Sequence, residues 1–549
     1  MKMKRAFAGL LLIFLLFTAG YAAPVTEQII VDQIGYRTTA DKWFMIADPR
    51  TGYNAAVDYV PGANVELRRA SDNTSVMTIP LTAWNAGAEH SQSGDVVWQG
   101  NFSTYTTPGT YYIFDPANNT QSFNFDISDD TYNTILESSV KSYYYQRCGT
   151  AITGAYGGAW THSACHTTNQ LNARLYDASL GGDQGAATAR DITGGWHDAG
   201  DYRKYTSWMA VIIWDLAYAY EWNPDAFSDG TGIPESGNGV PDILDEMKYE
   251  IDWMLRMQGT NGALYSGAFV VQGINGTGDG IGDPSTENRQ YFYANYSTAA
   301  TGSGCSAFAI GARLFAPYES AYPGYSAALQ TAAENAWAFL QANPGNITYN
   351  HTGFDNANAN KGVDADRGHR IMSAAELYRL TGDTNYRTYI DDHYDDTPTT
   401  GVHHPIASGY FETSGSYEIQ RGLMSYCMAP GATAAVVTAV KNSINQGIQN
   451  QAYGQRNNDP YKSYTWDGHH CWGSNGIKSE WGNLCVFGNK LNVNAGLSAV
   501  YLKTGEEYLH YIHGRNPISF NYLTQSQLYG ADKPITQIYH GWFHHGTAW

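Results

Sequence analysis

The segment from Gly194 to Tyr202 reads Gly-Gly-Trp-His-Asp-Ala-Gly-Asp-Tyr and holds the residues best suited to chemistry. Its two carboxylates, Asp198 and Asp201, are three positions apart and precede an apolar stretch that predicts a buried helix. Two close carboxylates repel each other, which can raise the pKa of one and equip the pair to activate water. A calcium loop or simple helix capping is the alternative, which the spacing alone favours. The glycines permit tight turns, and with the flanking Trp and Tyr they make catalysis plausible.

Sulfur and imidazole ligands lie before and within this segment. Cys148, Cys165, His166 and His197 supply two thiolates and two imidazoles, a set that suits tetrahedral zinc. Four protein ligands would close the site, so the zinc would be structural, and through His197 it would fix the loop that presents Asp198. The alternative is a disulfide between Cys148 and Cys165, which is normal in exported proteins. The residue types alone favour neither the zinc site nor the disulfide.

The remaining cysteines have no catalytic pattern. Cys305 lies in an apolar stretch that predicts a helix, so we expect a small buried hydrophobic residue there. Cys471 and Cys485 flank a Trp-Gly-Ser-Asn segment, and one possible arrangement pairs them in a disulfide.

Oxygen ligands gather around the predicted helix that begins at Pro241, and Asp364 and Asp366 form a second, weaker group. Acidic residues at a helix N-terminus complement the helix dipole, and this interpretation is favoured. Calcium is the alternative, because it prefers carboxylate and carbonyl oxygens. The first group comprises Glu235, Asn238, Asp242, Asp245 and Glu246.

Two patterns along the chain must position these residues. Residues 27–127 hold six or seven short β-branched or aromatic stretches separated by turns, which predicts an all-β sandwich. From residue 131 onward the hydrophobic periodicity predicts buried helices joined by long loops, which indicates helices wrapped around a central axis. The predicted helices are Tyr205–Trp222, Pro241–Met257, Ser297–Phe315, Tyr325–Ala342, Ile371–Thr381, Ala432–Ile448, Val493–Lys503 and Glu506–His513.

The segment around Asp198 resembles the signature of the family 9 glycoside hydrolases, which are mostly cellulases. Five further segments match family motifs in order. The resemblance implies a mainly α fold, with an (α/α)6 barrel over residues 131–549 preceded by a small all-β immunoglobulin-like sandwich over residues 27–127. It also implies hydrolysis of β-1,4-glucans with inversion. The further segments are Ile30–Tyr36, which resembles the start of the immunoglobulin-like module, and Tyr143–Thr150, Ser297–Thr301, Trp472–Asn475 and Gly514–Pro517.

The same resemblance implies roles for single residues. Asp201 is the general base, and Asp198 helps to hold the attacking water. Trp472 is expected to stack on the flat face of the glucan, and His540 resembles the family's substrate-contacting histidine. Relatives with this cysteine and histidine arrangement bind zinc, which favours a metal over a disulfide, and many members carry calcium. The zinc ligands would be Cys148, Cys165, His166 and His197.

Inverting hydrolysis also needs a general acid, roughly 6.5–9.5 Å from the base and on the opposite face of the sugar. Asp198 and Asp201 lie on one short turn, so they approach from one side. In the family the acid is a Glu that follows a His-containing loop. Here Tyr539–His545 resembles that loop, and no Glu follows before Trp549. We interpret the sequence as truncated, and expect this chain to be inactive or nearly so while the complete gene product is active.

Two alternatives to an active glucanase remain. One is a non-catalytic glucan-binding relative, which the missing Glu supports and the intact Asp198 and Asp201 oppose. The other is a zinc hydrolase that uses His197 with Asp198, and we rank it last because four protein ligands leave no position for water.

The composition suits a neutral sugar polymer. The 549 residues carry a net charge of −19, and only 15% of them are charged. They include 42 Tyr and 15 Trp. An acidic surface repels nucleic-acid phosphates, whereas aromatic rings stack on the C–H faces of sugars. We expect a β-1,4-glucan as the partner, no nucleic acid, and a monomer.

Residues 1–22 read as a signal peptide. A basic start precedes the apolar stretch Ala6–Ala19, and Gly20–Ala22 is a small-x-small cleavage site. The apolar stretch is short for a membrane anchor, which needs roughly 20 residues. We therefore expect a secreted endo-β-1,4-glucanase that acts on cellulose or related glucans and has no membrane attachment after cleavage.

Overall fold

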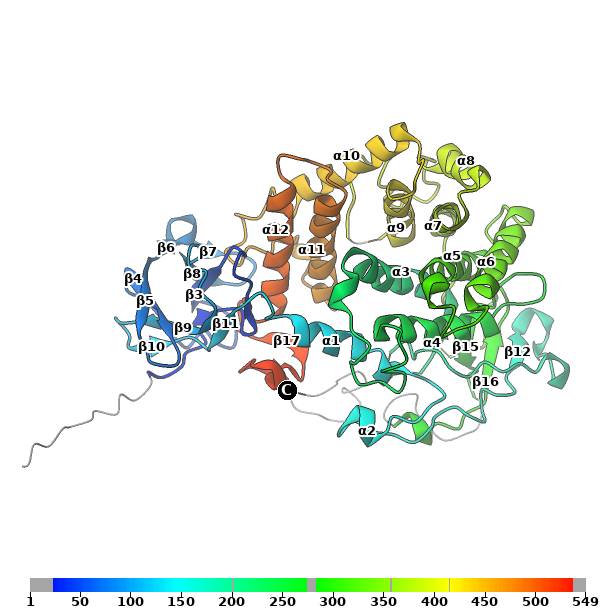
Figure 1. Cartoon of the computed structure of the whole chain (residues 1–549), viewed down its shortest axis with the longest axis horizontal. Helices are drawn as coiled ribbons and strands as arrows, with labels where there is room; N and C mark the ends of the chain where they lie inside the picture. Colours follow the sequence, from blue (N-terminus) through cyan, green and yellow to red (C-terminus); the bar gives the residue numbers. More distant parts are fainter. Residues whose placement is uncertain (1–22, 200–201, 274–282, 356–357, 414, 537–549) are drawn as a thin grey trace, which may run out of the picture.

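The computed structural model describes residues 23–199, 202–273, 283–355, 358–413 and 415–536 (Figure 1). The predicted signal peptide, Asp201 and His540 lie outside the described residues. Two modules lie side by side: a β-sandwich module formed by residues 25–127 and a helical module formed by residues 132–536. The predicted mainly α fold with an N-terminal β-sandwich is confirmed.

The β-sandwich module consists of two sheets, with strand orders β1-β3-β8-β6 and β2-β11-β9-β4-β5. β7 pairs with β8 and β10 with β9 at the sheet margins. Alternate residues such as Val65 and Leu67 point into the core between the sheets, as the period of two in a strand requires. The strands are β1 Ile29–Ile30, β2 Gly35–Tyr36, β3 Trp43–Pro49, β4 Asn64–Arg69, β5 Ser75–Pro80, β6 Thr82–Ala83, β7 Glu89–His90, β8 Asp95–Asn101, β9 Gly109–Asp115, β10 Thr120–Gln121 and β11 Phe125–Ile127.

The helical module is an (α/α)6-type barrel. α3, α5, α7 and α9 pack on one another in sequence as an inner layer, and α4, α6, α8 and α10 pack outside them. Among the described residues, no helix is both long enough and apolar enough to span a membrane. The helices are α1 Asn133–Lys141, α2 Gly154–Gly157, α3 Thr206–Trp222, α4 Asp242–Arg256, α5 Thr298–Phe315, α6 Tyr325–Ala342, α7 Val363–Thr381, α8 Thr384–His393, α9 Tyr417–Cys427, α10 Ala434–Asn450, α11 Ser474–Lys490 and α12 Ser498–Ile512.

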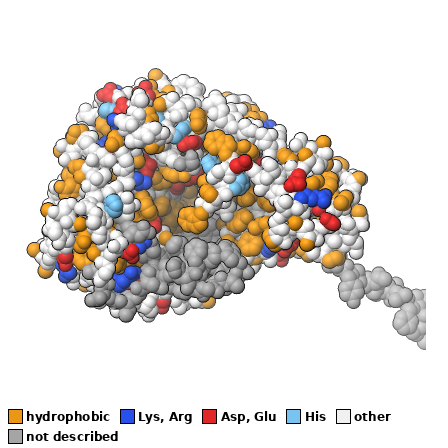
Figure 2. Space-filling model, turned by 180° about the vertical axis from the view of Figure 1, so that it is seen from behind, with side chains coloured by type: hydrophobic (Ala, Val, Ile, Leu, Met, Phe, Trp, Pro, Cys, Tyr) orange, Lys and Arg blue, Asp and Glu red, His pale blue; other side chains and the backbone are white. Residues whose placement is uncertain are grey.

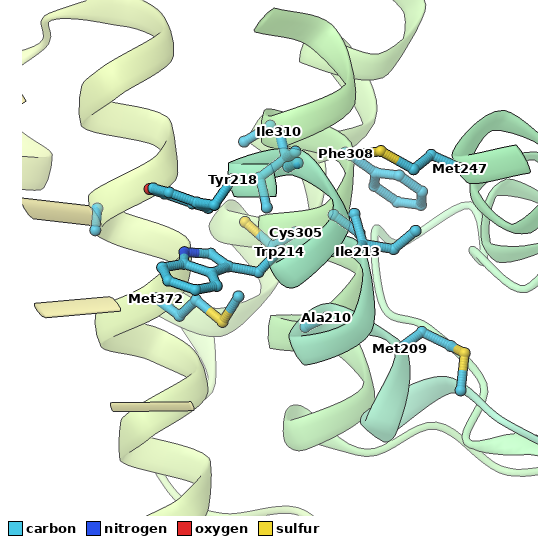
Figure 3. Packing of buried hydrophobic residues seen from close by; sticks show 14 of the residues in the cluster. Met209, Ala210, Ile213, Trp214, Tyr218, Met247, Cys305, Phe308, Ile310 and Met372 are labelled. Carbon is cyan, nitrogen blue, oxygen red and sulfur yellow. The ribbon is translucent and has the colours of Figure 1, made fainter. Parts of the chain in front are cut away.

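The inner layer is densely packed where α3 meets its neighbours. Figure 3 shows Trp214 and Tyr218 of α3 close to Cys305 of α5 and Met372 of α7. The rings of Trp214 and Tyr218 stack at 3.8 Å, and the indole N–H of Trp214 donates to Ser425 Oγ of α9 at 2.7 Å. Cys305 is fully buried, which confirms the expectation for this thiol.

Short strands also occur in the helical module, and the sequence did not indicate them. Five of them form a sheet of order β13-β12-β16-β15-β14, and β14 directly follows the carboxylate segment. The sheet therefore helps to place that segment at the start of α3. These strands are β12 Arg174–Asp177, β13 Gly182–Asp183, β14 Lys204–Tyr205, β15 Gly267–Val270 and β16 Tyr291–Ala294, and a separate pair is β17 Asn521–Thr524 and β18 Pro534–Ile535.

Two expectations near the C-terminus were wrong. The two helices predicted over 493–503 and 506–513 are one helix, α12, because Gly505 lies inside it against Gly482 of α11. The possible disulfide between Cys471 and Cys485 does not form, since both are free thiols. Cys485 lies within α11 and Cys471 lies before it, and the helical rise over 11 residues is roughly 17 Å, far beyond the reach of a disulfide.

The two modules are joined by a buried polar network around Asp32. The Oδ2 atom of Asp32 accepts hydrogen bonds from Nδ1 of His510, at 2.7 Å, and from Nδ1 of His513, at 3.2 Å. The next residue, Gln33, donates to the carbonyl of Ser519 at 3.0 Å and accepts from the backbone N–H of Lys533 at 2.8 Å. The first strands of the chain are thus fixed to its last described helix and loops.

Asp32 should make the docking of the modules dependent on pH. Burial alone would raise its pKa, but His513 and His510 outweigh it and hold the pKa of Asp32 well below its usual range. Because the pKa of Asp32 is lower in the folded protein than in the unfolded chain, where it is about 3.9, its ionised form stabilises the fold at any pH above about 3.9. This stabilisation is lost progressively as the pH falls below about 3.9. We expect Asp32→Asn to lower the free energy of unfolding by about 3 kcal/mol at pH 7.

Thermal unfolding from pH 3 to pH 7 checks this expectation, with the exposed Asp58→Asn in the same module as the matched control. The gap between the Asp32→Asn variant and the unsubstituted chain should narrow below about pH 4. An equal gap at pH 3 and pH 7 would contradict it.

Candidate functional site

The carboxylate segment passes from the interior of the helical module to its surface between His197 and Asp198. His197 is buried, whereas Asp198 is exposed. The N–H of Asp198 donates to the carbonyl of Arg203 at 2.8 Å, which closes a turn around the positions between them. Asp198 is therefore open to solvent, and the predicted base Asp201 lies outside the described residues.

A buried lysine holds this segment from below. Lys204 is 1% exposed, and its ammonium donates to the carbonyls of Ile192 and Gly194 at 2.6 and 2.8 Å. Its third hydrogen bond goes to Oε1 of Gln170 at 2.7 Å. The indole N–H of Trp253 donates to the same Ile192 carbonyl at 3.2 Å. Because each bond satisfies a buried acceptor, the backbone leading to Asp198 is fixed in one conformation.

Glu250 of α4 holds the next residues of the segment. Its Oε2 atom accepts the backbone N–H of Trp196 at 2.6 Å. Gly195 lies so close to this carboxyl group that a Cβ there would be 2.8 Å from Oε2, and its φ of +71° also favours glycine. Burial raises the pKa of Glu250 to about 8. Near pH 7 the side chain of Glu250 is therefore mostly uncharged, and it fixes the backbone of Trp196 through this hydrogen bond.

Tyr202 follows the two predicted carboxylates in a strained conformation. Its φ is +60°, which is uncommon for a bulky side chain. The ring is 5% exposed and packs against the rings of His197 and His166, with centroids 4.9 and 5.6 Å away. Such strain is retained where the surroundings over-determine it, and it concentrates at functional sites.

The four predicted zinc ligands converge on one point. One ligand atom from each of Cys148, Cys165, His166 and His197 lies within 4.8 Å of all the others, and all four residues are buried. No other cluster of three or more such ligands occurs in the described ranges. The two cysteines are free thiols, so the alternative disulfide is not formed.

The chemistry of these four residues fits a zinc ion. Neither ring nitrogen of the buried His166 has a hydrogen-bond partner among the described atoms. Burial opposes ionisation of Cys148, but Cys165 and Lys204 outweigh it and lower the pKa of Cys148 well below its usual value. A thiolate and an unpartnered buried imidazole are the donors that tetrahedral zinc requires.

The predicted oxygen ligands have protein partners instead. Arg147 forms ion pairs with Glu235 and Glu246 at 3.0 and 2.9 Å. Oδ2 of Asp242 accepts from the N–H and hydroxyl of Thr231 at 2.6 and 2.7 Å. Asn238 of the same group donates to Asp245 at 3.0 Å. In the second group, Asp364 accepts hydrogen bonds from the N–H groups of Thr399 and Thr400. Asp366 forms an ion pair with Arg370. Calcium at either group stays a prediction.

Trp472 lies immediately before α11 with 88% of its surface exposed. Trp466, on the same loop, is 40% exposed. An indole this exposed presents its ring to a flat apolar ligand. On the face shown in Figure 2 the molecule is hollowed near its middle, and hydrophobic side chains line part of the hollow. The roles predicted for Trp472 and His540 remain predictions.

Sequence reasoning missed the residues that support the segment. Lys204, Gln170 and Glu250 contribute buried polar atoms that no local motif marks. One signal was available: Glu246 and Glu250 are four positions apart on the buried face of an amphipathic helix, which is an unusual place for two carboxylates. Such a pair indicates partners on a neighbouring segment.

Comparison with known proteins agrees with this geometry. Residues 132–548 match the family model for glycosyl hydrolase family 9, and residues 25–120 match the model for the cellulase N-terminal ig-like domain. Endoglucanase D of Acetivibrio thermocellus is 29% identical over 458 residues, which are 81% of this chain and 67% of that protein. A xyloglucan-specific endo-beta-1,4-glucanase of Bacteroides ovatus is 29% identical over 369 residues, 66% of this chain and 59% of that protein. The chain thus spans about two thirds or less of these relatives' lengths.

Solved structures show the same arrangement. A metagenome-derived glycoside hydrolase family 9 endoglucanase superposes with a TM-score of 0.74 at 28% identity, covering 92% of this chain and 86% of that one. A zinc-binding triple mutant of the family 9 endoglucanase J30 superposes with a TM-score of 0.71 at 26% identity, covering 88% and 82%. With the family model matching from residue 132 to residue 548, the chain belongs to glycosyl hydrolase family 9.

Proposed function

We propose that this chain is a secreted endo-β-1,4-glucanase that hydrolyses cellulose or a related β-glucan with inversion. The observation that carries the proposal is the exposed Asp198, held on a rigid backbone by the buried Lys204 and Glu250. A rigid loop that offers a carboxylate to solvent is what activation of a water molecule requires. The named relatives, which include endoglucanases, support the substrate class.

In this mechanism the two aspartates act on one water molecule. Asp201 removes a proton from the water, and Asp198 accepts its second hydrogen bond and so aims its oxygen at the anomeric carbon. Attack from the face opposite the leaving oxygen inverts the configuration, and a separate carboxylic acid must protonate that oxygen. Trp472 would stack on a neighbouring glucose unit and fix the chain.

The non-catalytic alternative is not favoured. Similar proteins carry the names of endoglucanases, a cellodextrinase and a cellobiosidase, all of which are enzymes. A zinc hydrolase is also disfavoured, because the four converging ligands would fill a tetrahedral coordination sphere.

The test compares the viscosity of a soluble cellulose with the release of reducing ends. An endo-acting enzyme cuts internal bonds, so viscosity should collapse while few ends have formed. The assay is run on this chain and on a form that carries a general-acid Glu, and we expect turnover only where that acid is present. No turnover by the form with the acid on any β-1,4-glucan would refute the proposal.

We also propose that Cys148, Cys165, His166 and His197 hold a structural zinc ion. The ion would cross-link residues 148–166 to the segment that carries Asp198, and it would supply no reacting group. Calcium at the oxygen ligands around α4 is a second, less supported proposal, and the same metal analysis would test it.

Removal of the zinc site should destabilise the helical module. We expect Cys165→Ser to lower bound zinc from about one ion per chain to none. The melting temperature should fall by roughly 5 °C or more, because metal binding contributes directly to the stability of the fold. Elemental analysis and calorimetry measure both quantities, and Cys427→Ser, outside the cluster, is the matched control. A Cys148–Cys165 disulfide with no bound zinc would disprove the site.

A further inference from the structure

A groove at the junction of the two modules has no part in the function proposed above. Its volume is about 410 Å³, within the range of roughly 300–1,000 Å³ typical of small-molecule sites. One wall comes from the β-sandwich module and the other from the segment before α11 of the helical module. The lining residues used below are Trp84, Asn85, Gln99, Asn457, Asn458 and Lys462.

Hydrogen bonds between the modules fix the positions of the two walls relative to each other. The indole N–H of Trp84 donates to the carbonyl of Asn457 at 3.0 Å. The amide of Gln99 on β8 donates to the carbonyl of Pro460 at 2.6 Å. Because these bonds cross from one module to the other, the groove is formed before any ligand arrives, which lowers the entropy cost of binding.

Several polar groups in the groove have capacity for a ligand. Within the parts of the chain that the structure describes, the carboxamides of Asn85 and Asn457 have no hydrogen-bond partner inside the protein. Asn458 uses its N–H₂ group on Gln455 and keeps a carbonyl oxygen. Asn457 and Asn458 are exposed, so their amides can donate to and accept from an incoming molecule.

The backbone that presents Asn85 is strained. A 3-10 turn spans Trp84–Gly87, and in it Asn85 and Ala86 have φ values of +43° and +54°. A non-glycine residue in this region is uncommon and is held there by its surroundings. The turn keeps Asn85 and the adjacent Trp84 at the groove.

The chemistry of the groove selects a neutral ligand. No carboxylate lines it, and its single cation, Lys462, has its ammonium 4.0 Å from the ring centroid of Trp43. One indole with several amides can contact the C–H faces of a sugar while hydrogen-bonding its hydroxyls. This combination of one indole and several amides suits a hydroxyl-rich, uncharged ligand better than an ion or an apolar peptide.

We propose that this groove is an accessory binding site for glucose units of a β-glucan, separate from the segment that carries Asp198. The inference rests on the proposed function, because it assigns the same class of polymer to a second site. Both modules supply its contacts, so the site exists only when they are docked.

Affinity electrophoresis in native gels that contain soluble hydroxyethylcellulose tests the site on the full chain. Thr82→Arg places a long side chain in the groove, and Asn457→Ala removes one amide. We expect the dissociation constant for the glucan to rise about tenfold for Thr82→Arg and about fivefold for Asn457→Ala, the latter being the loss of one hydrogen bond. Thr107→Arg, an equally exposed threonine of the same module outside the groove, should migrate like the unsubstituted chain. Each variant's melting temperature reports whether it has folded.

Trp472→Ala distinguishes binding in the groove from binding at Trp472. If the groove binds glucan, the Trp472→Ala chain retains part of its retardation, and adding Asn457→Ala raises the remaining dissociation constant about a further fivefold. Groove variants that migrate unchanged, while Trp472→Ala abolishes retardation, would overturn the groove and leave the proposed function intact. An equal loss in Thr107→Arg would overturn it as an effect of charge. No retardation of the unsubstituted chain by any β-glucan would overturn both.

Discussion

Replacing Asp198 with asparagine is expected to lower kcat on soluble cellulose by about a thousandfold in a form of the protein that carries a general-acid Glu. The exposed carboxylate is the part of the site that meets water, and asparagine keeps its shape but loses its charge and its acceptor strength. The backbone N–H of residue 198, which donates to Arg203, is unchanged by the substitution. The melting temperature should therefore stay within about 2 °C of the unsubstituted protein.

The control for this experiment is Asp191→Asn, on the same surface segment. Asp191 is also exposed, and it pairs with Arg256 at 3.0 Å away from the carboxylate turn. Its substitution should change kcat less than about twofold, because asparagine can still accept the hydrogen bonds from the N–H and hydroxyl of Thr193, and an exposed ion pair contributes little. Asp201→Asn should match or exceed the loss at Asp198. Comparable turnover in the Asp198→Asn and Asp191→Asn proteins would exclude a catalytic role for Asp198.

The second large effect is expected on stability, from Lys204→Met. Methionine fills a similar volume but removes three hydrogen bonds, those to Gln170 Oε1 and to the carbonyls of Ile192 and Gly194, and of these acceptors Ile192 keeps the indole N–H of Trp253. Each unsatisfied group costs about 1–3 kcal/mol, so we expect a loss of roughly 3–5 kcal/mol in the free energy of unfolding. The freed backbone leads directly to Asp198, so kcat should fall with stability.

Denaturant unfolding followed by intrinsic fluorescence measures this loss. Lys490→Met is the matched control, because Lys490 is exposed at the end of α11 and donates only one long hydrogen bond, of 3.5 Å. It should change the free energy of unfolding by less than about 0.5 kcal/mol. A similarly small change in Lys204→Met would show that the segment is held by its other contacts.

Local pattern was enough to predict elements whose apolar face is continuous. The helix expected over Tyr325–Ala342 has those bounds in the structure, because its buried Leu and Ala residues recur at helical spacing. The prediction for α7 began at Ile371, eight residues late. Its first turns contain Asp366 and Arg370, which pair with each other four positions apart and are buried without an apolar pattern. Buried ion pairs of this kind leave no hydrophobic periodicity for the sequence to show.

The site divides in the same way. Asp198 and the four predicted metal ligands belong to short motifs, so the sequence singled them out, but spacing alone left capping or calcium and a disulfide open, and the family resemblance chose between the alternatives. Lys204 and Glu250 could not be predicted, because their partners are backbone groups of residues 192–196 that only the folded chain brings near. The groups that fix an active loop are long-range and often backbone-directed, whereas the groups that react are local.

The contacts of Gln33 have a consequence for how the protein is made. Its side chain donates to a carbonyl 486 positions later in the chain. A ribosome adds about 5–20 residues per second, so roughly 25–100 s pass between synthesis of the two partners. During that interval the β-sandwich module can fold, but its surface around Asp32 and Gln33, which residues 510–533 later cover, stays open to water and to other chains. Full burial of this surface therefore depends on a segment made several hundred residues later, and slow translation would prolong the exposure of that surface.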